Sequence, residues 1–313
     1  MSRRTLVVTN DFPPKTGGIE SFVFAMLTRL PAQDLVVLTS RQPGDSDFDA
    51  GLAFPVVRYP TRMLLPTPAV TAEAVRLARA HQASRVWFGA AAPLALMTPA
   101  LRQAGITRAV ATTHGHEVWW ATLPGSRALL RRIGDAVDVL TYLGEYTRRR
   151  IARALRPAAA ARMVRLTPGV DERVFAPGCG GEQIRRERGL GRRPVVGCVS
   201  RLVPRKGQDT LIRAWPTVRR AVPDAVLKLV GAGTPRARER LTQLAARTGV
   251  ADSVLLVGEV PWGGLPPYLD AGDVFAMPAR DRWGGLEVEG LGIVYLEASA
   301  TGCCMIRDCC FST

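Results

Sequence analysis

Short apolar runs rich in β-branched residues alternate with segments of helical periodicity along nearly the whole chain. In the first half, strands are expected at residues 5–9, 35–39, 56–59, 85–88, 109–113 and 137–142. Helices are expected between them, at 18–30, 69–81, 93–104, 126–133 and 144–155. A strand that is apolar on both faces and is followed by a crossover helix is typical of a parallel sheet covered on both sides. The alternation therefore predicts an α/β fold.

The same pattern restarts after a stretch rich in proline and glycine at residues 168–181. Beyond it, strands are expected at 195–200, 226–230, 254–257 and 274–277. Helices are expected at 209–221, 235–247 and 291–300. We therefore predict two doubly wound Rossmann-like domains, an N-terminal one at residues 1–172 and a C-terminal one at 173–313. In such folds the ligand binds beyond the carboxyl ends of the strands.

Composition excludes several classes of protein. With 47% hydrophobic and 22% charged residues among 313, the chain is too apolar for long intrinsic disorder. No apolar run approaches the roughly 18 residues of a membrane span, and the apolar stretch near the N-terminus is too short for a secretory signal. The six cysteines are few and clustered, which favours reduced thiols in a cytosol over a disulfide framework.

The net charge of +15 suits a polyanion or an anionic membrane. Nucleic acid is a poor candidate, because aromatic residues make up only 6% of the chain and no RNA-binding or zinc-finger pattern is present. Basic residues crowd two neighbouring helical segments, where they form either an ordinary solvated face or a surface for anionic lipid. These residues are Arg127, Arg131, Arg132, Arg148, Arg149, Arg150 and Arg153.

Two glutamates, Glu289 and Glu297, bracket an apolar, glycine-containing run that opens the helix expected at 291–300. At about 100° per residue, eight steps return to within roughly 80° of the starting direction, so both carboxylates can address one ligand. Gly290 and Gly292 allow the backbone to approach that ligand, and the amides of a helix N-terminus favour an anion such as phosphate. The competing interpretation is an amphipathic helix with two solvated acids.

Two strand ends in the first half also have a composition suited to ligand binding. The strand at 5–9 leads into a proline-rich loop and then Gly17-Gly18, which opens a helix and leaves its amides accessible to an anion, although a plain connecting turn would look similar. The strand at 109–113 runs into His114-Gly115-His116-Glu117. We expect His114 at the floor of the cleft, with His116 as the less favoured choice and a metal pair or a structural histidine as the alternatives.

In the second half, the strand at 195–200 ends just before Arg201, and Lys206 follows shortly before the next helix. Arg offers a bidentate fork and Lys a compact charge, so together they can hold a diphosphate without a metal. A solvated basic loop is the alternative. Two further patterns are expected to be uninformative. Asp45-Ser46-Asp47 fits a metal-binding D-x-D but is predicted to be a surface turn, and the paired cysteines 303–304 and 309–310 lack zinc-site spacing.

With these residues in place, the chain resembles the retaining glycosyltransferases of the GT-B type, in glycosyltransferase family 4. The resemblance runs from about Leu6 to Gly302, and it rests on Gly17-Gly18, the segment 113–118, Arg201 with Lys206, and the segment 288–297. Within the family, these motifs look most like those of mannosyltransferases that use GDP-mannose. The resemblance implies transfer of mannose, with retention, to a phosphatidylinositol-mannoside-type lipid. It also implies a cytoplasmic protein, peripheral on the inner face of a bacterial plasma membrane.

The resemblance further implies roles for individual residues. Arg201 and Lys206 would hold the diphosphate, Glu297 the ribose hydroxyls and Glu289 the sugar hydroxyls. The catalytic residues would be His114, near the transferred sugar, and Glu289, and Gly18 would approach donor and acceptor. The phosphates would be capped by the backbone of Gly290, Leu291, Gly292 and Ile293, and the guanine would lie near Val260. No cofactor or metal is expected.

The chain departs from the family pattern after Gly302, where a short cysteine-rich run ends the sequence. We expect a truncated or frameshifted second domain, in which the run after Gly302 still forms one strand. Three hypotheses follow: a working mannosyltransferase, an inactive remnant or binding module, and a nucleotide-sugar epimerase. Use of another nucleotide sugar by the same type of transferase is a further alternative.

Overall fold

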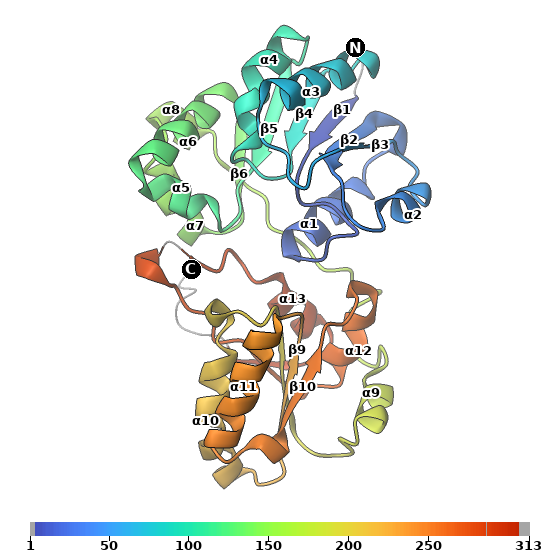
Figure 1. Ribbon diagram of the computed structural model, residues 1–313, viewed down its shortest axis with the longest axis vertical. Coiled ribbons are helices and arrows are strands. Elements are labelled where there is room, and N and C mark those ends of the chain that lie inside the picture. Colours follow the sequence, from blue (N-terminus) through green and yellow to red (C-terminus); the bar gives the residue numbers. More distant parts are fainter. Residues whose placement is uncertain (1–3, 286, 307–313) are drawn as a thin grey trace. The chain divides into compact units, whose positions relative to one another are not determined.

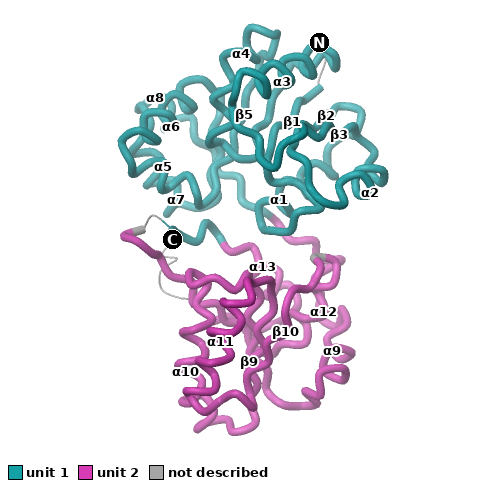
Figure 2. Tube along the Cα trace, in the orientation of Figure 1, with its two compact units in different colours: residues 1–168, 285–291 teal, residues 169–284, 292–313 magenta. Residues whose placement is uncertain are grey.

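The computed structural model describes residues 4–285 and 287–306 (Figure 1). It divides into two compact units (Figure 2), of which unit 1 comprises residues 1–168 and 285–291, and unit 2 comprises 169–284 and 292–313. The first segment of unit 1 therefore ends at residue 168, shortly before the predicted boundary at 172. Unit 1 also includes residues 285–291, which sequence analysis placed in the C-terminal domain.

Unit 1 contains a seven-stranded parallel sheet in the order β3-β2-β1-β4-β5-β6-β7. Its strands are β1 Thr5–Val8, β2 Leu35–Ser40, β3 Val56–Tyr59, β4 Arg85–Phe88, β5 Arg108–Thr112, β6 Val139–Tyr142 and β7 Val164–Arg165. Its helices are α1 Gly18–Leu27, α2 Asp45–Ala50, α3 Pro68–Ala80, α4 Thr98–Gln103, α5 Glu117–Thr122, α6 Pro124–Ala136, α7 Glu145–Ala152 and α8 Pro157–Ala161.

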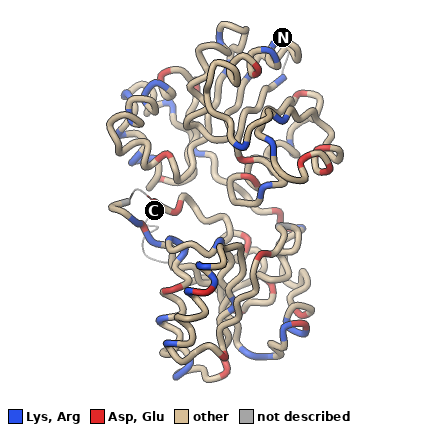
Figure 3. Tube along the Cα trace, viewed as in Figure 1, with Lys and Arg blue, Asp and Glu red and all other residues tan. Residues whose placement is uncertain are grey.

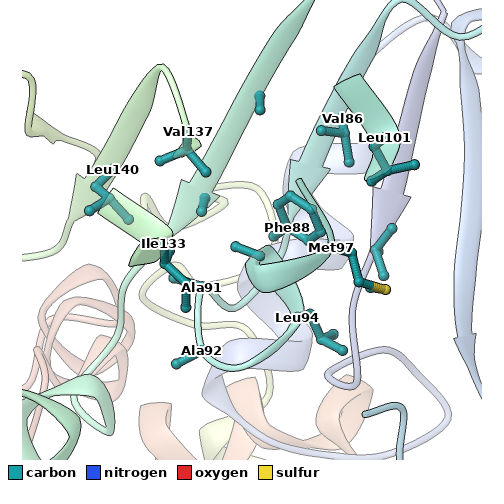
Figure 4. Close-up of a cluster of buried hydrophobic side chains, with 14 of the residues drawn as sticks. Val86, Phe88, Ala91, Ala92, Leu94, Met97, Leu101, Ile133, Val137 and Leu140 are labelled. Atoms are coloured by element: carbon teal, nitrogen blue, oxygen red, sulfur yellow. The ribbon is translucent and has the colours of Figure 1, made fainter. Parts of the chain in front are cut away.

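Both faces of this sheet are buried, as the apolar strand sequences predict. Along β1, Leu6 and Val8 belong to one core cluster, whereas Val7 belongs to a second. Successive side chains of a strand point to opposite faces, so this alternation places one core on each side of the sheet. Figure 4 shows part of the larger core, in which Phe88 of β4 lies among side chains of the neighbouring strands and helices.

Unit 2 contains a five-stranded parallel sheet in the order β10-β9-β8-β11-β12. Its strands are β8 Val195–Val199, β9 Val226–Val230, β10 Val254–Gly258, β11 Val274–Ala276 and β12 Cys304–Ile306. Its helices are α9 Gly181–Glu187, α10 Gln208–Ala221, α11 Pro235–Arg247, α12 Leu265–Asp270 and α13 Ile293–Ala300. The β8 and β11 strands pair at the point where the strand order reverses, which is where ligands bind in open α/β sheets.

The predicted fold class, two doubly wound α/β domains, is confirmed. All ten predicted strands are present within a residue or two of the expected bounds, and Cys304–Ile306 forms the short strand expected after Gly302. The prediction for Asp45-Ser46-Asp47 is wrong, because these residues begin α2 rather than forming a turn. The helix expected at 93–104 is a 3-10 turn, Leu94–Met97, followed by α4.

Candidate active site

The loops that follow β1, β4 and β5 meet at one edge of the sheet in unit 1, because these parallel strands are neighbours. A Cβ on Gly89, just after β4, would lie 2.6 Å from Thr9 Oγ1, just after β1. The ring nitrogen Nε2 of His114, after β5, lies 2.8 Å from the carbonyl oxygen of Gly89. Glycine at position 89 thus allows the three loops to pack directly together.

His114 is buried in this edge, with 3% of its surface exposed. Its Nε2 must donate to the Gly89 carbonyl, since a carbonyl oxygen only accepts, and Nδ1 is therefore the acceptor nitrogen of the neutral ring. The ring also contacts Phe22 edge to face, with centroids 5.9 Å apart. Burial lowers the pKa of His114, so its ring is neutral near pH 7.

His116 lies nearer the surface, with 36% of its side chain exposed. Its ring stacks on that of His114, with centroids 6.2 Å apart and an angle of 19° between the planes. His114 is therefore buried and held by its hydrogen bond to Gly89, whereas the imidazole ring of His116, stacked on it, is partly accessible to solvent.

Glu289, Gly290 and Leu291 belong to unit 1 and lie outside any helix. A Cβ on Gly290 would lie 3.0 Å from the backbone nitrogen of Gly115, so this segment packs directly on the histidine turn. Val288 is buried in the larger core of unit 1 and anchors the segment. Glu289 lies in the loop that enters α13 and Glu297 on the second turn of this helix, as expected, but the angle of 100° per residue does not apply between them, because α13 begins only at Ile293.

Gly17 and Gly18 stand at the start of α1, where Gly17 occupies the N-cap position and Gly18 is exposed. Sequence analysis missed the charges at this turn. Lys15 Nζ lies 2.9 Å from Glu20 Oε1 and 3.2 Å from Asp11 Oδ1. Although burial alone would lower it, the pKa of Lys15 is raised by these two carboxylates. The carboxylate of Glu20 therefore lies in the first turn of α1, the position near a helix N-terminus that a bound anion would also favour.

In unit 2, Arg201 is exposed in the loop after β8, and Lys206 is half-buried in a 3-10 turn, Pro204–Lys206. Gln208, which sequence analysis missed, is buried and donates from Nε2 to the Arg201 carbonyl oxygen at 2.9 Å. This contact fixes the backbone from which the Arg201 side chain extends. A buried glutamine one turn after a basic loop offers no recognisable pattern in the sequence.

The loop after β11 packs against the same edge. Gly207 has φ 76°, and a Cβ there would lie 2.0 Å from the Pro278 carbonyl oxygen. The Arg280 backbone nitrogen donates to the Arg205 carbonyl oxygen at 2.9 Å. Residues 278–280 are thus fixed relative to the loop of Arg201 and Lys206.

Helix α13 begins after Gly292, whose left-handed conformation (φ 70°, ψ 68°) turns the chain into the helix. The Tyr295 hydroxyl donates to the Met277 carbonyl oxygen and so ties α13 to the end of β11. The remaining candidate, Val260, lies just beyond β10 and packs partly against the core of unit 2.

Glu297, on the second turn of α13, is 6% exposed, so the interpretation of a solvated acid is excluded for this residue. Burial raises its pKa to about 7. Within residues 4–285 and 287–306, its carboxyl group makes no hydrogen bond or ion pair. A buried acid without a protein partner is costly, and such groups are frequent at ligand sites.

Comparisons with known proteins identify the family to which this arrangement belongs. Residues 16–174 match the family described as Glycosyltransferase Family 4, and residues 193–308 match Glycosyl transferases group 1. The chain belongs to glycosyltransferase family 4. This glycosyltransferase is 51% identical over 302 residues to the GDP-mannose-dependent alpha-(1-6)-phosphatidylinositol monomannoside mannosyltransferase of Mycolicibacterium smegmatis, covering 95% of the chain and 78% of the relative.

A second relative of the glycosyltransferase, from Corynebacterium glutamicum, is described as a GDP-mannose-dependent monoacylated alpha-(1-6)-phosphatidylinositol monomannoside mannosyltransferase. It is 46% identical, over 96% of the chain and 79% of its own length. Among solved structures, Anabaena HepE in complex with UDP and glucose superposes with a TM-score of 0.78 at 16% identity, covering 96% of the chain and 80% of HepE. Sucrose-phosphate synthase from Thermosynechococcus elongatus gives 0.70 at 18% identity, over 96% and 80%. The predicted GT-B fold of the glycosyltransferase is therefore confirmed.

Over the part of the chain that the structure describes, no helix of the glycosyltransferase is long and apolar enough to cross a bilayer.

Proposed function

We propose that the protein transfers mannose from GDP-mannose to a phosphatidylinositol-mannoside-type lipid, with retention of configuration at the anomeric carbon. Two relatives that match almost the whole chain at 51% and 46% identity have names that specify this donor and this class of acceptor. The proposal rests above all on the buried carboxyl group of Glu297, which has no partner among the described residues and lies on the helix that follows β11.

On the donor side, Glu297 is suited to accept hydrogen bonds from the two ribose hydroxyls. The ligand would then supply the partners that the protein lacks, which offsets the cost of burial. Arg201 and Lys206 would hold the diphosphate, since they extend from the loop after β8, the strand adjacent to β11. We assign Val260 to the guanine and Glu289 to the sugar hydroxyls. Gly18 and His114 would lie near the transferred sugar. The phosphates would be contacted by the backbone of Gly290, Leu291, Gly292 and Ile293.

The chemistry that we assign to these residues is stabilisation of the leaving group. The bond between the anomeric carbon and the diphosphate oxygen breaks and the electron pair leaves with GDP. The acceptor hydroxyl attacks from the same face and passes its proton to the departing diphosphate oxygen. Arg201 and Lys206 neutralise the charge that develops on the diphosphate, and each charge-assisted contact contributes about 1.5–3 kcal/mol. Since these side chains can replace a metal, we propose that turnover persists in the presence of a chelator.

We further propose peripheral binding to anionic membranes through α6 and α7, on a part of unit 1 where Figure 3 shows several basic residues. Not all of these arginines are equally available. Arg148 and Arg149 pair with Glu145, and Arg127 donates to the Arg153 carbonyl oxygen at 2.8 Å. The exposed side chains of Arg132 and Arg153 are the best candidates for contact with lipid.

Sedimentation with vesicles tests this membrane proposal. Replacement of Arg132 and Arg153 by Gln should weaken binding to vesicles of phosphatidylcholine with phosphatidylglycerol. The same replacement of two exposed arginines on α11, Arg236 and Arg240, is the control for the change in net charge. Equal weakening in the two double variants would contradict a specific face.

Turnover with radiolabelled GDP-mannose, with and without phosphatidylinositol monomannoside, tests the proposed reaction. A mannosylated lipid formed only with acceptor supports it, and product formed without acceptor indicates an epimerase. Consumption of UDP-sugars but not GDP-mannose would contradict the assigned donor, and no turnover of any donor would indicate an inactive protein. Arg201→Ala should lower kcat by about two orders of magnitude, whereas Arg240→Ala should not.

A further inference from the structure

The turn from His114 to Glu117 joins β5 to α5, and one buried carboxylate holds it from within. Glu117 is fully buried at the first position of α5. Its Oε2 accepts a hydrogen bond from the backbone nitrogen of His114 at 2.7 Å. Its Oε1 lies 3.1 Å from Nε2 of His116. A single side chain therefore contacts the turn on both sides of Gly115.

Gly115 is the point at which this turn meets the segment of Glu289. A Cβ on Gly115 would lie 3.1 Å from the backbone nitrogen of Gly290 and 3.3 Å from the Val288 carbonyl oxygen, so the two backbones are in direct contact. A shift of the turn therefore displaces Gly290 and, with it, the neighbouring Glu289. The position of Glu117 thus determines where this segment lies on unit 1.

The second carboxylate oxygen of Glu117 lies close to the ring of His116. Oε1 is buried and makes no hydrogen bond of standard geometry with the described residues, yet the His116 ring nitrogen lies at ion-pair distance. A carboxylate only accepts, so it favours a proton on Nε2 of His116 and leaves Nδ1 as the acceptor nitrogen of the neutral ring. His114 cannot take this part, because its own Nε2 donates to Gly89.

We propose that Glu117 is a positioning residue for the transfer reaction: it sets the Gly115 turn against Gly290 and fixes the proton of His116 on Nε2. The proposal rests on the proposed function, because the segment it positions is the one to which we assign the sugar of the donor. It assigns no contact between Glu117 and substrate, since the side chain is fully buried.

Nitrogen NMR of the imidazole rings tests the structural half without any turnover. The chain has only three histidines, so His81→Gln and His114→Gln variants suffice to assign the signals of His116. At about pH 9, where histidine is neutral, His116 should carry its proton on Nε2. In Glu117→Gln, the amide oxygen can keep the His114 bond and the amide NH₂ then faces His116, so the proton should move to Nδ1. An unchanged tautomer would overturn the proposal.

Kinetics tests the functional half. Glu117→Ala should lower kcat at least about tenfold, because a displaced segment misplaces the sugar, while the dissociation constant of GDP changes less than about twofold. Glu117→Gln should restore kcat to within about threefold of the wild type, since it can still accept from His114. Weaker GDP binding in parallel with the loss of kcat would overturn the positioning role.

Asp138→Ala is the matched control for Glu117→Ala. Asp138 Oδ2 likewise accepts from a backbone nitrogen, that of Ala109, at 2.7 Å, but at the opposite end of β5. An equal loss of kcat in this variant would show that Glu117 acts through general stability, against the proposal. If the wild type does not use GDP-mannose, the proposed function fails, and the tautomer measurement still decides the structural half.

Discussion

Gly115 and Gly290 lie in backbone contact although 174 positions separate them in the sequence. A Cβ on Gly290 would lie 3.0 Å from the Gly115 backbone nitrogen, which is closer than a Cβ normally approaches another residue. It would lie 3.5 Å from Leu143 Cδ1, an ordinary van der Waals distance. The contact places the segment that contains Glu289 on the carboxyl edge of the first sheet. This edge is also where His114 and His116 lie.

Gly290→Ala should therefore displace the segment and lower kcat by about tenfold, with a loss of stability of about 1–3 kcal/mol from overpacking. Gly125→Ala, in the first turn of α6, is the control, because a Cβ there meets nothing within 4 Å. It should leave kcat unchanged. Turnover and urea unfolding of both variants test the prediction, and equal activities would contradict it.

The buried acid of α13 leads to a prediction about pH. The pKa of Glu297 in the folded protein is about 7, above its ordinary value of 4.5, so the folded state binds the proton more tightly than the unfolded chain. Stability attributable to this group is therefore present below about pH 4.5 and is lost as the pH rises through about 7. At about 1.4 kcal/mol per pKa unit, the penalty above pH 7 is on the order of 3 kcal/mol.

Glu297→Gln removes this penalty. Its free energy of unfolding relative to wild type should rise between about pH 4.5 and pH 7 and then stay constant. Glu73→Gln is the control, since Glu73 pairs with Arg76, whose side-chain hydrogen bond lowers the pKa of Glu73. Its effect should be small, opposite in sign and nearly constant over this range, because the lowered pKa of Glu73 places its titration at lower pH. Urea unfolding across this range measures both, and a pH-independent difference for Glu297→Gln would contradict the prediction.

Two glycines with nearly the same backbone conformation allow strain and steric clash to be separated. Gly207 has φ 76° and Gly44 has φ 75°. A Cβ on Gly207 would lie 2.0 Å from the Pro278 carbonyl oxygen, whereas one on Gly44 would meet nothing within 4 Å. Gly44→Ala should cost about 1 kcal/mol, the cost of a left-handed non-glycine residue.

Gly207→Ala should cost at least about 3 kcal/mol, because the two loops must also separate. Since these loops lead to Arg201, Lys206 and α13, its GDP affinity should fall as well, while that of Gly44→Ala should not. Equal losses of stability in the two variants would show that the clash is relieved without cost. Thermal unfolding and GDP titration supply the two measurements.

The sheets of both units could be predicted from the sequence because buried parallel strands are recognisable as short β-branched runs. Several helices of five to seven residues could not, such as α2 and α12, because so few turns show no clear periodicity. Lys228 interrupts the apolar run of β9, yet it is fully buried and donates to the Tyr268 carbonyl oxygen at 2.5 Å. Burial lowers its pKa to about 8.

The candidate site could be predicted only in part, for a similar reason. Arg201 and Lys206 lie between a strand and a helix, where basic residues are conspicuous, and Glu297 follows a glycine-containing run at the start of α13. Glu117 and Gln208 act through hydrogen bonds to the backbone of residues that precede them by three and seven positions, which no sequence motif reveals. The packing of Gly290 on Gly115 is likewise a long-range contact, and a helical-wheel argument cannot anticipate it.

Arg58 is expected to hold the loop before α1 in place. Its side chain is 7% exposed, and its Nη2 donates to the Pro13 carbonyl oxygen at 2.6 Å and to Asp49 Oδ1 at 2.7 Å, while Nε donates to Asp49 Oδ2 at 2.9 Å. Arg58→Ala should cost about 3 kcal/mol or more, because it leaves the Asp49 carboxylate without its partner. Asp49→Ala should cost less, since Arg58 keeps its bond to Pro13.

A double-mutant cycle separates these contributions. The coupling between Arg58 and Asp49, measured by urea unfolding of both single variants and the double variant, should be about 1–3 kcal/mol. Arg58→Lys should recover little of the loss, because an ammonium group lacks the planar fork that binds both carboxylate oxygens and the Pro13 carbonyl together. Full recovery by lysine would show that charge alone holds the loop. A coupling near zero would place the effect of Arg58 in its bonds to the Pro13 and Ser40 carbonyl oxygens and its contact with the Phe12 ring.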